Sequence, residues 1–551
     1  MKTLKTPTAG LKIDPILTEV VCKQIFGLAE EMGSTLIRTA YSPNIKQRAD
    51  CSTAVLDLTG RVYAQAPRIP IHLGSMVGAV QALLRNHPLD TLREGDMFMS
   101  NDPFLGGGQH LPDINIIAPV FSGDEPIAFV ANIAHHADVG GMVPGSESIV
   151  CRTIYQEGIR LPPIQVVRQN NIIPDIIDLV AANSRTPDER RGDLRAQIAA
   201  NRIGLRRFQT CLSRYGQDLV LSSLESYLAA TEQRFRTRLA SLDDQTIEVV
   251  DYLDPDLFGD DSPLPIHLTL KKVNDRLHLD FTGSAAALSS ARNVPLSALH
   301  STVYAVIKML MDPELPANSG YFGAIEIAAP EGCFLNPKPG AAVGARALPC
   351  AVIGDVVAQA LAKLVPEKAI ASGGPHHQAI FAGKDETGKM WVNYETYAGA
   401  QGARPYRDGV DGVRIHASGA SNLPVEALEQ VYPLRVLRYA LRDGTGGKGT
   451  FRGGSGIVRD YEMLNATTIS LAAERQVVSA SGIAGGAAGS PGQFVLNPQT
   501  DRERILSSAA GDMLLAAGDI LSIRTPGSGG YGPENRRAKE MIERDKLEKR
   551  T

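Results

Sequence analysis

Apolar residues recur at helical spacing close to the start of the chain. Asp14-Pro15 is a helix-start signal, because a capping side chain precedes a proline at the first helical position. The apolar face that follows consists of Val21, Ile25, Leu28 and Met32. We therefore predict a helix that ends near Tyr41, since Pro43 disfavours helical backbone in the residue before it. The most helical region is predicted over residues 175–242, where Gly216 separates two helices.

Apolar and polar residues alternate within the stretch 101–141. The two faces of a predicted strand consist of Ile114, Ile116 and Ala118 on one side and Asn115, Ile117 and Pro119 on the other. A tight turn at Ser122-Gly123-Asp124-Glu125 separates this strand from a second, mostly apolar one over Ile127–Ala134. The pattern predicts an antiparallel hairpin about Gly123–Asp124.

The second half of the chain carries shorter patterns. Apolar residues alternate between Ile266 and Phe281 around Asn274-Asp275, which predicts another hairpin. Helices are predicted over residues 72–86, 297–311 and 352–364. The last ~150 residues read as short strands between glycine-rich turns, which is typical of an all-β region.

These patterns predict a mixed, multi-domain α+β fold. A chain of 551 residues is too long for one compact core. We expect a helix-rich N-terminal α/β portion at residues 1–245, which contains the hairpin and the long helices. A β-rich C-terminal portion with glycine-rich turns is expected at residues 246–533, followed by a charged, exposed helical tail at residues 534–551.

Composition narrows the function classes. The net charge is −4 with no long run of one sign, so we expect no nucleic-acid partner and no membrane partner. The six cysteines are scattered without a CxxC pair, which argues against a disulfide framework and against a thiolate zinc site. The N-terminal residues lack an apolar signal core, and no segment is predicted to span a bilayer. We therefore expect a reduced, cytoplasmic protein.

The hairpin gathers imidazoles and carboxylates at one end. In its predicted register Asp113 lies opposite Ala134 or His135, and His110 lies close to Ala137. His110, Asp113 and His135 then form a set that suits Mn, Fe or Zn and leaves positions open for water or substrate. The alternative is a hydrogen-bonded His/Asp cluster that only satisfies the end of a strand.

Further polar residues extend this set. Asp50, just before a strand predicted over Thr53–Leu58, is an additional acidic ligand candidate, or else a solvated loop carboxylate. His136 and Asp138 follow His135 directly. A second pair, His376-His377, lies in a predicted loop, and we interpret it as a surface pair.

The chain offers no nucleotide phosphate loop. Gly444–Gly449 matches GxGxxG but lacks the strand before it and the helix after it that give the match meaning. It also fails the P-loop pattern, because Gly449 follows Lys448 where serine or threonine is required. If the reaction consumes ATP, we expect the nucleotide on a different chain.

Seven short motifs occur in one order along the chain. They are Asn101-Asp102-Pro103, His110-Leu111-Pro112-Asp113, His135-His136-Ala137-Asp138 with Pro144-Gly145-Ser146, Asp280-Phe281-Thr282-Gly283-Ser284, Ala329-Pro330-Glu331-Gly332, Asn422-Leu423-Pro424-Val425-Glu426 and Thr525–Gly532. With these motifs the chain resembles the hydantoinase B/oxoprolinase family along almost its whole length. The glycine motifs are individually weak, but seven in order make the resemblance specific.

The resemblance implies a division of labour between two chains. Family members include the B-type chains of ATP-dependent hydantoinases and lactam hydrolases, the C-terminal half of 5-oxoprolinase, and one chain of the acetone and acetophenone carboxylases. Each works with a hydantoinase A-type partner of actin-like ATPase fold, which binds ATP and phosphorylates a carbonyl oxygen. The B-type chain resembles the metal-bearing half of a hetero-oligomer.

The resemblance also assigns roles to residues. It implies a divalent metal on His110, Asp113 and His135, with Asp50 as a possible fourth ligand. His136 and Asp138 are then candidates for the catalytic base or for orienting a ligand imidazole. The implied activity is hydrolysis of a small cyclic amide of the 5-oxoproline, hydantoin or lactam type. The alternatives are a component of an ATP-dependent ketone carboxylase, which would use the same metal residues, and a non-catalytic structural partner of the ATPase chain.

Overall fold

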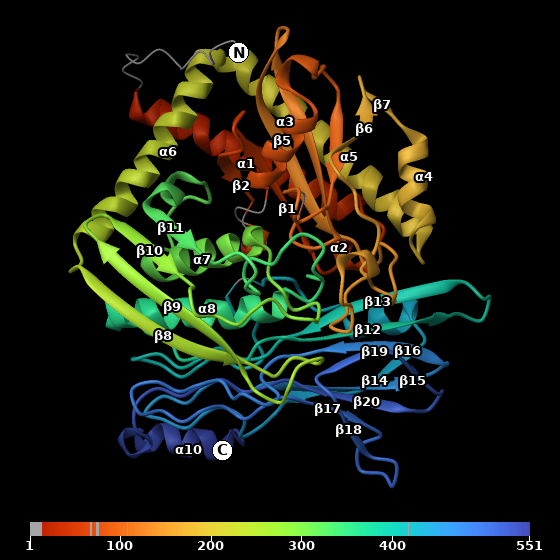
Figure 1. Cartoon of the computed structure of the whole chain (residues 1–551), viewed down its shortest axis with the longest axis vertical. Coiled ribbons are helices and arrows are strands. Elements are labelled where there is room, and N and C mark those ends of the chain that lie inside the picture. The colour runs from red at the N-terminus through yellow and green to blue at the C-terminus, as the bar shows by residue number, and fades with distance from the viewer. Residues whose placement is uncertain (1–13, 67–68, 73–75, 107, 417, 551) are drawn as a thin grey trace.

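The computed structural model describes residues 14–66, 69–72, 76–106, 108–416 and 418–550. Helices and strands are mixed throughout, and the described strands form four sheets (Figure 1). The predicted α+β class is confirmed. Only β10 and β11 pair in parallel among the described ladders, so the N-terminal sheet is antiparallel rather than wound in parallel βαβ units.

The first sheet has seven strands in the order β2-β1-β5-β4-β3-β6-β7. Its strands are β1 (Cys51–Leu56), β2 (Val62–Gln65), β3 (Met97–Ser100), β4 (Asp113–Ser122), β5 (Glu125–His135), β6 (Ile164–Arg168) and β7 (Asn171–Ile172). The helices of this region are α1 (Pro15–Thr39), α2 (Pro43–Lys46), α3 (Val77–Asn86), α4 (Pro174–Ala182), α5 (Pro187–Tyr215) and α6 (Gln217–Ala240).

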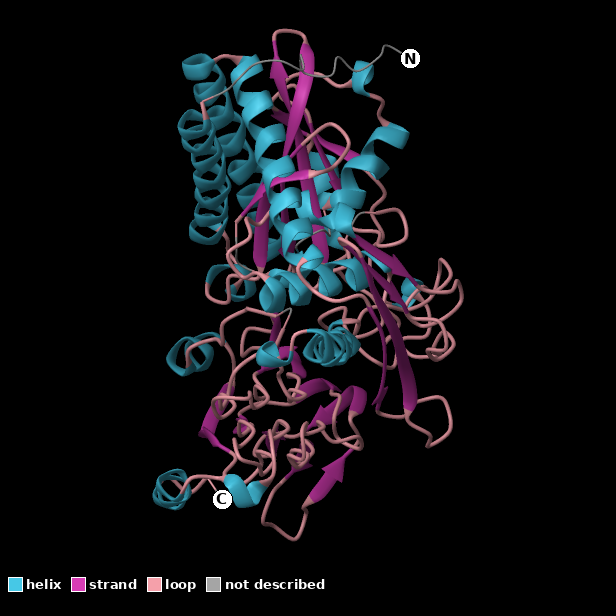
Figure 2. Ribbon diagram, turned by 90° about the vertical axis from the view of Figure 1, so that its left-hand side faces the viewer, coloured by secondary structure: helices cyan, strands magenta, loops and turns pink. Residues whose placement is uncertain are grey.

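Helices cover both faces of this sheet. On one face α1, α5 and α6 bury Ile114, Ile116 and Ala118 of β4, and Figure 2 shows the long helices running beside the strands. On the other face α3 packs against Ile117 and Phe129. The alternation predicted for residues 114–119 is therefore confirmed, with both faces buried.

The predicted helix ends are close to the observed ones. The Asp14 carboxylate accepts a hydrogen bond from the backbone N–H of Ile16 at 2.9 Å, and α1 ends at Thr39. Gly216, with φ of +80°, separates α5 from α6 as predicted. The helix predicted over residues 72–86 begins only at Val77, because residues 70–72 form a short 3-10 turn; residues 73–75 lie outside the described chain.

The β4–β5 hairpin turns at Gly123 and pairs Ser122 with Glu125. An irregularity between Val120 and Phe121 then shifts the ladder by one residue. That shift pairs Asp113 with His135 rather than with Ala134. The bulge therefore decides between the two partners that the sequence left open.

A second sheet has the order β11-β10-β9-β8. Its strands are β8 (Gln245–Leu253), β9 (Leu264–Val273), β10 (Arg276–Asp280) and β11 (Ile325–Ala328). Two helices, α7 (Leu296–Met311) and α8 (Ala347–Leu364), share one apolar core with this sheet. The hairpin predicted around Asn274-Asp275 is the β9–β10 connection.

The C-terminal region is a pair of packed sheets. Their orders are β13-β12-β16-β19 and β14-β15-β20-β17-β18. The strands are β12 (His377–Lys384), β13 (Met390–Tyr397), β14 (Leu434–Leu441), β15 (Ile457–Met463), β16 (Thr467–Ala472), β17 (Gln493–Leu496), β18 (Arg504–Leu506), β19 (Ala509–Leu515) and β20 (Ile520–Arg524), with one helix, α9 (Val425–Val431), between β13 and β14. Side chains of both sheets meet in one apolar cluster, which is typical of a β-sandwich.

The domain boundaries predicted at residues 245 and 533 stay predictions. The terminal helix α10 (Lys539–Leu547) is less exposed than expected, because Asp545 is buried and pairs with Arg537. Arg537 also pairs with Asp408 at 2.7 Å. These contacts hold the tail against the sandwich.

One described helix, α8, is long and apolar enough to cross a membrane by length and composition, which the sequence pattern did not predict. In the structure 78% of that helix is buried within the protein. Its partners include α7, β8 and β9. This burial is typical of a core helix.

Phe129 tests the packing of the central strand. It is fully buried on β5 beneath α3. We expect Phe129→Ala to destabilise the first sheet by about 3–5 kcal/mol, because it removes a buried ring and leaves a cavity. The measurement is chemical denaturation followed by circular dichroism, with Ile505→Ala, at a site 68% exposed, as the control. An unchanged unfolding midpoint in Phe129→Ala would contradict this packing.

Candidate metal centre

The end of the β4–β5 hairpin lies where the three structural regions meet (Figure 1). β5 delivers His135, and β4 begins at Asp113. Arg346 directly precedes α8 of the second region, and Tyr394 comes from β13 of the sandwich. Residues that are hundreds of positions apart therefore line one site.

Three buried side chains there can hold a metal ion. His110, His135 and Glu147 each offer a ligand atom, and these atoms lie within 4.8 Å of one another. The His110 and His135 rings have centroids 4.9 Å apart. Glu147 Oε2 lies 3.3 Å from His135 Nε2. Imidazole nitrogens with a carboxylate oxygen are a donor set for Zn, Mn or Fe.

Unsatisfied buried atoms support a metal at this cluster. His110 Nε2, Glu147 Oε1 and Asp113 Oδ1 are buried and make no hydrogen bond to the described residues. Buried polar atoms normally have a partner, so three such atoms in one cluster need an explanation. A divalent ion would satisfy them, and the donor set therefore fits the metal that the sequence pattern predicted.

The backbone of a distant loop orients His110. Its Nδ1 lies 3.0 Å from the carbonyl oxygen of Gly344. That contact makes Nδ1 the protonated nitrogen and leaves the lone pair on Nε2, as metal-binding histidines require. Glu157 holds the loop in place, because its Oε1 accepts hydrogen bonds from the backbone N–H groups of Val343 and Gly344.

His135 is held by Asn44. Arg48 donates a hydrogen bond to Asn44 Oδ1 at 2.5 Å, so the amide nitrogen of Asn44 faces His135 Nδ1 at 2.9 Å and its carbonyl oxygen at 2.7 Å. With Nδ1 accepting, the ring proton lies on Nε2 and points toward Glu147. To bind a metal through Nε2, the ring would have to carry its proton on Nδ1, with the Asn44 amide shifted, or the ring would have to turn.

Electrostatics favour ionised carboxylates in this cluster. Burial opposes ionisation of Glu147, but the neighbouring His110 and its hydrogen bond from His135 lower its pKa to about 2. Burial likewise opposes ionisation of Asp113, yet His110 and Arg346 hold its pKa well below the ordinary range. The pKa of His110 is lowered, because burial and Arg346 outweigh the opposing effect of Asp113 and Glu147.

The pKa of His135 moves in the opposite direction. Burial would lower it, but the hydrogen bond to Glu147 and the charge of Asp50 outweigh burial and raise the pKa. The ring also stacks on Tyr394, with centroids 4.5 Å apart. His135 therefore faces an acidic neighbour on one edge and an aromatic ring on its face.

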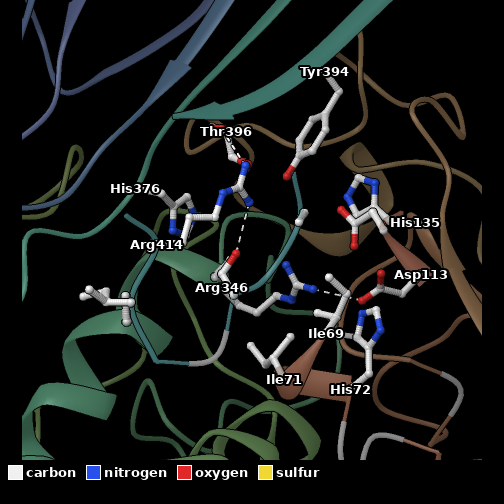
Figure 3. Close-up of a pocket in the computed structure, with 16 residues that line it drawn as sticks. Ile69, Ile71, His72, Asp113, His135, Arg346, His376, Tyr394, Thr396 and Arg414 are labelled. Carbon is white, nitrogen blue, oxygen red and sulfur yellow. Dashed lines mark hydrogen bonds and ion pairs between the residues drawn. The ribbon is translucent and has the colours of Figure 1, made fainter. Parts of the chain in front are cut away.

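A cavity opens beside the cluster. Its volume is about 50 Å³. Figure 3 shows Asp113, His135 and Tyr394 around one side and His376 and Arg414 on the opposite side, with Arg346 between them. A larger cleft of about 590 Å³ lies between α3 and α7, but none of the cluster residues lines it.

Of the residues predicted as metal ligands, the structure brings His110, Asp113 and His135 together. Asp113 Oδ2 lies 3.4 Å from His110 Nε2 and accepts a hydrogen bond from Arg346 at 2.9 Å. Asp50 lines the cavity and is only half-buried, and its backbone oxygen accepts a hydrogen bond from the His135 backbone. Neither its carboxylate nor that of Asp113 is part of the three-residue cluster.

The two residues predicted as a base lie elsewhere. His136 faces α5, where its Nε2 lies 3.0 Å from Gln197 Oε1. Asp138 accepts hydrogen bonds from the backbone of Gly140 and Gly145 and pairs with Arg185 at 3.0 Å. Neither residue lines the cavity.

The sequence pattern did not indicate four residues of the site, and it predicted a surface position for a fifth, His376. Glu147 directly follows the Pro144-Gly145-Ser146 motif, and that proximity was the available signal. Nothing in the sequence pattern linked Arg346, Tyr394 or Arg414 to the hairpin. The interpretation of His376-His377 as a surface pair is wrong: both are buried, His377 begins strand β12 of the sandwich, and His376 lines the cavity.

Comparisons with known proteins point to one family. The sequence model described as hydantoinase B/oxoprolinase matches residues 14–534. The chain is 34% identical to 5-oxoprolinase 1 of Arabidopsis thaliana over 95% of this chain, which spans 43% of that protein. It is 31% identical, over 98% of this chain and 93% of its relative, to a Pseudomonas sp. (strain NS671) protein whose name describes one of the subunits of a D-/L-hydantoinase.

Two solved structures share the fold. The ATP-dependent caprolactamase from Pseudomonas jessenii aligns with a TM-score of 0.90 at 27% identity, covering 98% of this chain and 94% of that one. The nucleotide-free acetone carboxylase aligns with a TM-score of 0.88 at 18% identity, covering 97% and 78%. At this lower identity the second likeness shows the fold alone.

The raised pKa of Glu157, which holds the loop behind His110, predicts that the stability of the protein depends on pH. Burial raises its pKa to about 8, although the Gly344 and Val343 N–H groups favour the charged form. In the unfolded chain Glu157 therefore ionises near pH 4.5, whereas in the folded chain it stays protonated until about pH 8. Between these pH values the unfolded chain binds fewer protons than the folded chain, so Glu157 lowers the free energy of unfolding as the pH rises.

We expect Glu157→Gln to match the parent protein near pH 4.5 and to become more stable than it by about 1.4 kcal/mol per pH unit up to pH 8. The glutamine oxygen keeps both backbone hydrogen bonds. The measurement is the denaturation midpoint from pH 4.5 to 8.5, with Glu367→Gln, whose side chain is 67% exposed, as the control. A stability difference that does not vary with pH would contradict the raised pKa.

Proposed function

We propose that this chain, which belongs to the hydantoinase B/oxoprolinase family, is the metal-bearing component of an ATP-dependent cyclic amide hydrolase. The observation that carries the proposal is the buried His110, His135 and Glu147 cluster, whose unsatisfied atoms adjoin a small cavity. Family membership supports an amide hydrolase, and the cluster supports metal-assisted chemistry on a small molecule.

A partner chain would supply the ATP chemistry. The described residues contain no phosphate loop of the P-loop pattern. The Pseudomonas sp. (strain NS671) relative, which is covered almost throughout, is named as part of a multi-subunit hydantoinase, and the Arabidopsis 5-oxoprolinase is more than twice as long as this chain. Both facts support an A-type ATPase partner. We further propose that the complex is cytoplasmic.

The chemistry of a ring amide explains this division. The nitrogen donates electrons into the carbonyl, so the carbon resists attack by water. Phosphorylation of the carbonyl oxygen by the partner would turn that oxygen into a leaving group. A divalent ion bound at this site would supply a water activated for attack near neutral pH.

The chain's own residues would prepare the site for that attack. Gly344 would keep the His110 lone pair on Nε2, toward the cluster. Glu147 and Asp113 would be ionised at neutral pH, because their neighbours lower both pKa values. Arg346 would hold Asp113 in place through its hydrogen bond.

Two residues that the sequence pattern indicated as bases fit a positioning role better. Asp138 would fix the loop that carries Glu147, since it binds the backbone at both ends of residues 140–145. His136 would anchor the end of β5 to α5 through Gln197. Asp50 and Tyr394 lie on the cavity wall, where they can contact the substrate.

A ketone carboxylase is the alternative in the same family. It would use the same residues, and the acetone carboxylase shares the fold at 18% identity. The caprolactamase is more similar in sequence, at 27% identity, and its name describes action on a cyclic amide. This difference favours the hydrolase.

The ligand set predicts the metal content. We expect His110→Ala and Glu147→Gln to reduce bound Mn, Zn or Fe at least about tenfold, since each removes a donor from the cluster. Mass spectrometry of the purified protein measures metal identity and amount. His278→Ala is the control, because His278 is 36% exposed and pairs with Glu326 outside the site. A parent protein without metal, or variants that keep it, would exclude this centre.

Activity is predicted to need both chains. We expect no ATP hydrolysis by this chain alone, and ATP-dependent ring opening when it is co-purified with its A-type partner. The assay compares 5-oxoproline, hydantoin, caprolactam, and acetone with bicarbonate. Carboxylation of acetone without amide hydrolysis would establish the alternative reaction. Full activity in a complex that contains His110→Ala would instead make this chain a structural partner.

A further inference from the structure

Arg414 lines the cavity across from the metal cluster and has no counter-ion among the described residues (Figure 3). Its guanidinium donates hydrogen bonds to Ser418 Oγ at 3.1 Å and to the Thr396 carbonyl oxygen at 2.6 Å. Both acceptors are neutral. Within the described chain Arg414 forms no ion pair with a carboxylate, whereas the buried Arg459 pairs with Glu395 and the buried Arg475 pairs with Asp251.

A second arginine on the same cavity is only partly satisfied. Arg346 is 4% exposed and donates from one terminal nitrogen to Asp113. Its Nε is buried and makes no hydrogen bond to the described residues. Arg346 therefore keeps donor capacity beside the cavity after binding Asp113.

The neighbours of Arg414 compensate its charge only in part: the carboxylates of Asp50 and Glu395 favour its charged form, but neither forms an ion pair with it among the described residues. Arg48 is close enough to add to this charge, and burial and Arg48 together lower the pKa of Arg414 to about 10. His376 beside it is neutral, because burial and Arg414 lower the pKa of His376 to about 3. Asp50 and Asp113 are the carboxylates among the described residues that line the cavity, and neither forms an ion pair with Arg414.

Such an arrangement is costly unless something pairs with the guanidinium. Arg414 is half-buried in the wall of the cavity, and withdrawing part of an arginine from water without a counter-ion costs free energy that a bound anion would offset. A planar guanidinium presents paired N–H donors that match the two oxygens of a carboxylate or a phosphoryl group. A small oxyanion bound in the cavity would therefore supply the counter-ion that Arg414 lacks.

We propose that Arg414, together with the free donor of Arg346, forms an oxyanion subsite that binds the carboxylate or the phosphoryl group of the substrate opposite His135. The inference rests on the proposed function and deepens it. A carboxylate bound there would make a ring acid of the 5-oxoproline type the substrate class. If it binds a phosphoryl group, Arg414 would bind the substrate after the partner has phosphorylated its carbonyl oxygen.

Isothermal titration calorimetry on the full chain, metal-loaded and metal-depleted, tests this subsite. The probes are inorganic phosphate, 5-oxoproline and 2-pyrrolidinone, which has the same ring without the carboxylate. We expect Arg414→Met to weaken binding of phosphate or of 5-oxoproline by roughly 10-fold to 100-fold and to leave 2-pyrrolidinone unchanged. Arg414→Lys should recover part of the lost affinity, since it keeps the charge but not the paired donors.

Arg435→Met is the matched control, because Arg435 is 57% exposed on β14 and pairs with Glu462. A loss confined to phosphate identifies the phosphoryl group as the ligand, and a loss confined to 5-oxoproline identifies the carboxylate. Equal affinities of parent and Arg414→Met for both anions, or an equal loss for 2-pyrrolidinone, would overturn the subsite. Metal content is measured on the same samples. If the metal is bound but Arg414→Met changes neither anion affinity, the subsite is wrong and the metal centre stands.

Discussion

The candidate centre depends on the antiparallel pairing of β4 with β5. That ladder places Asp113 opposite His135 at the end of a hairpin whose two faces are both buried. A one-residue slip in a strand pair would turn every side chain to the other face of the sheet. Burial of both faces under helices therefore fixes the direction of His135, and the bulge near Val120 fixes its partner. The chemistry of the site is in this sense a consequence of strand register.

Charge compensation explains why the remaining residues come from so far away. Glu147 and Asp113 are fully buried carboxylates, and two isolated charges of this kind would destabilise the fold. Arg346 from the second region supplies positive charge next to them, and Arg48 orients Asn44 beside His135. Arg48 also donates hydrogen bonds to the Tyr394 carbonyl oxygen and to Thr396 Oγ1 on β13. These contacts of Arg48 join the sandwich to the N-terminal region beside the cluster.

Periodicity and local signals predicted the elements that carry the first half of the site. The cap at Asp14, the break at Gly216 and the alternation along β4 are local features, and each leaves a mark in a short window of sequence. Glu147 could not be placed, because an irregular loop has no period that defines its direction. Arg346, Tyr394 and Arg414 required knowledge of how the regions pack. For His136, adjacency to His135 was misleading, since neighbouring residues of a strand point to opposite faces.

The hydrogen bond between His110 and the carbonyl oxygen of Gly344 spans 234 residues of chain. An orienting contact of that range exists only after the distant segment has docked, so a form of the protein in which that segment is undocked lacks the contact that orients the imidazole. A metal ion that prefers the aimed imidazole would then bind the finished molecule more tightly than any intermediate and would stabilise it by mass action. Metal supply would in that case act on the yield of native protein during biosynthesis as well as on turnover.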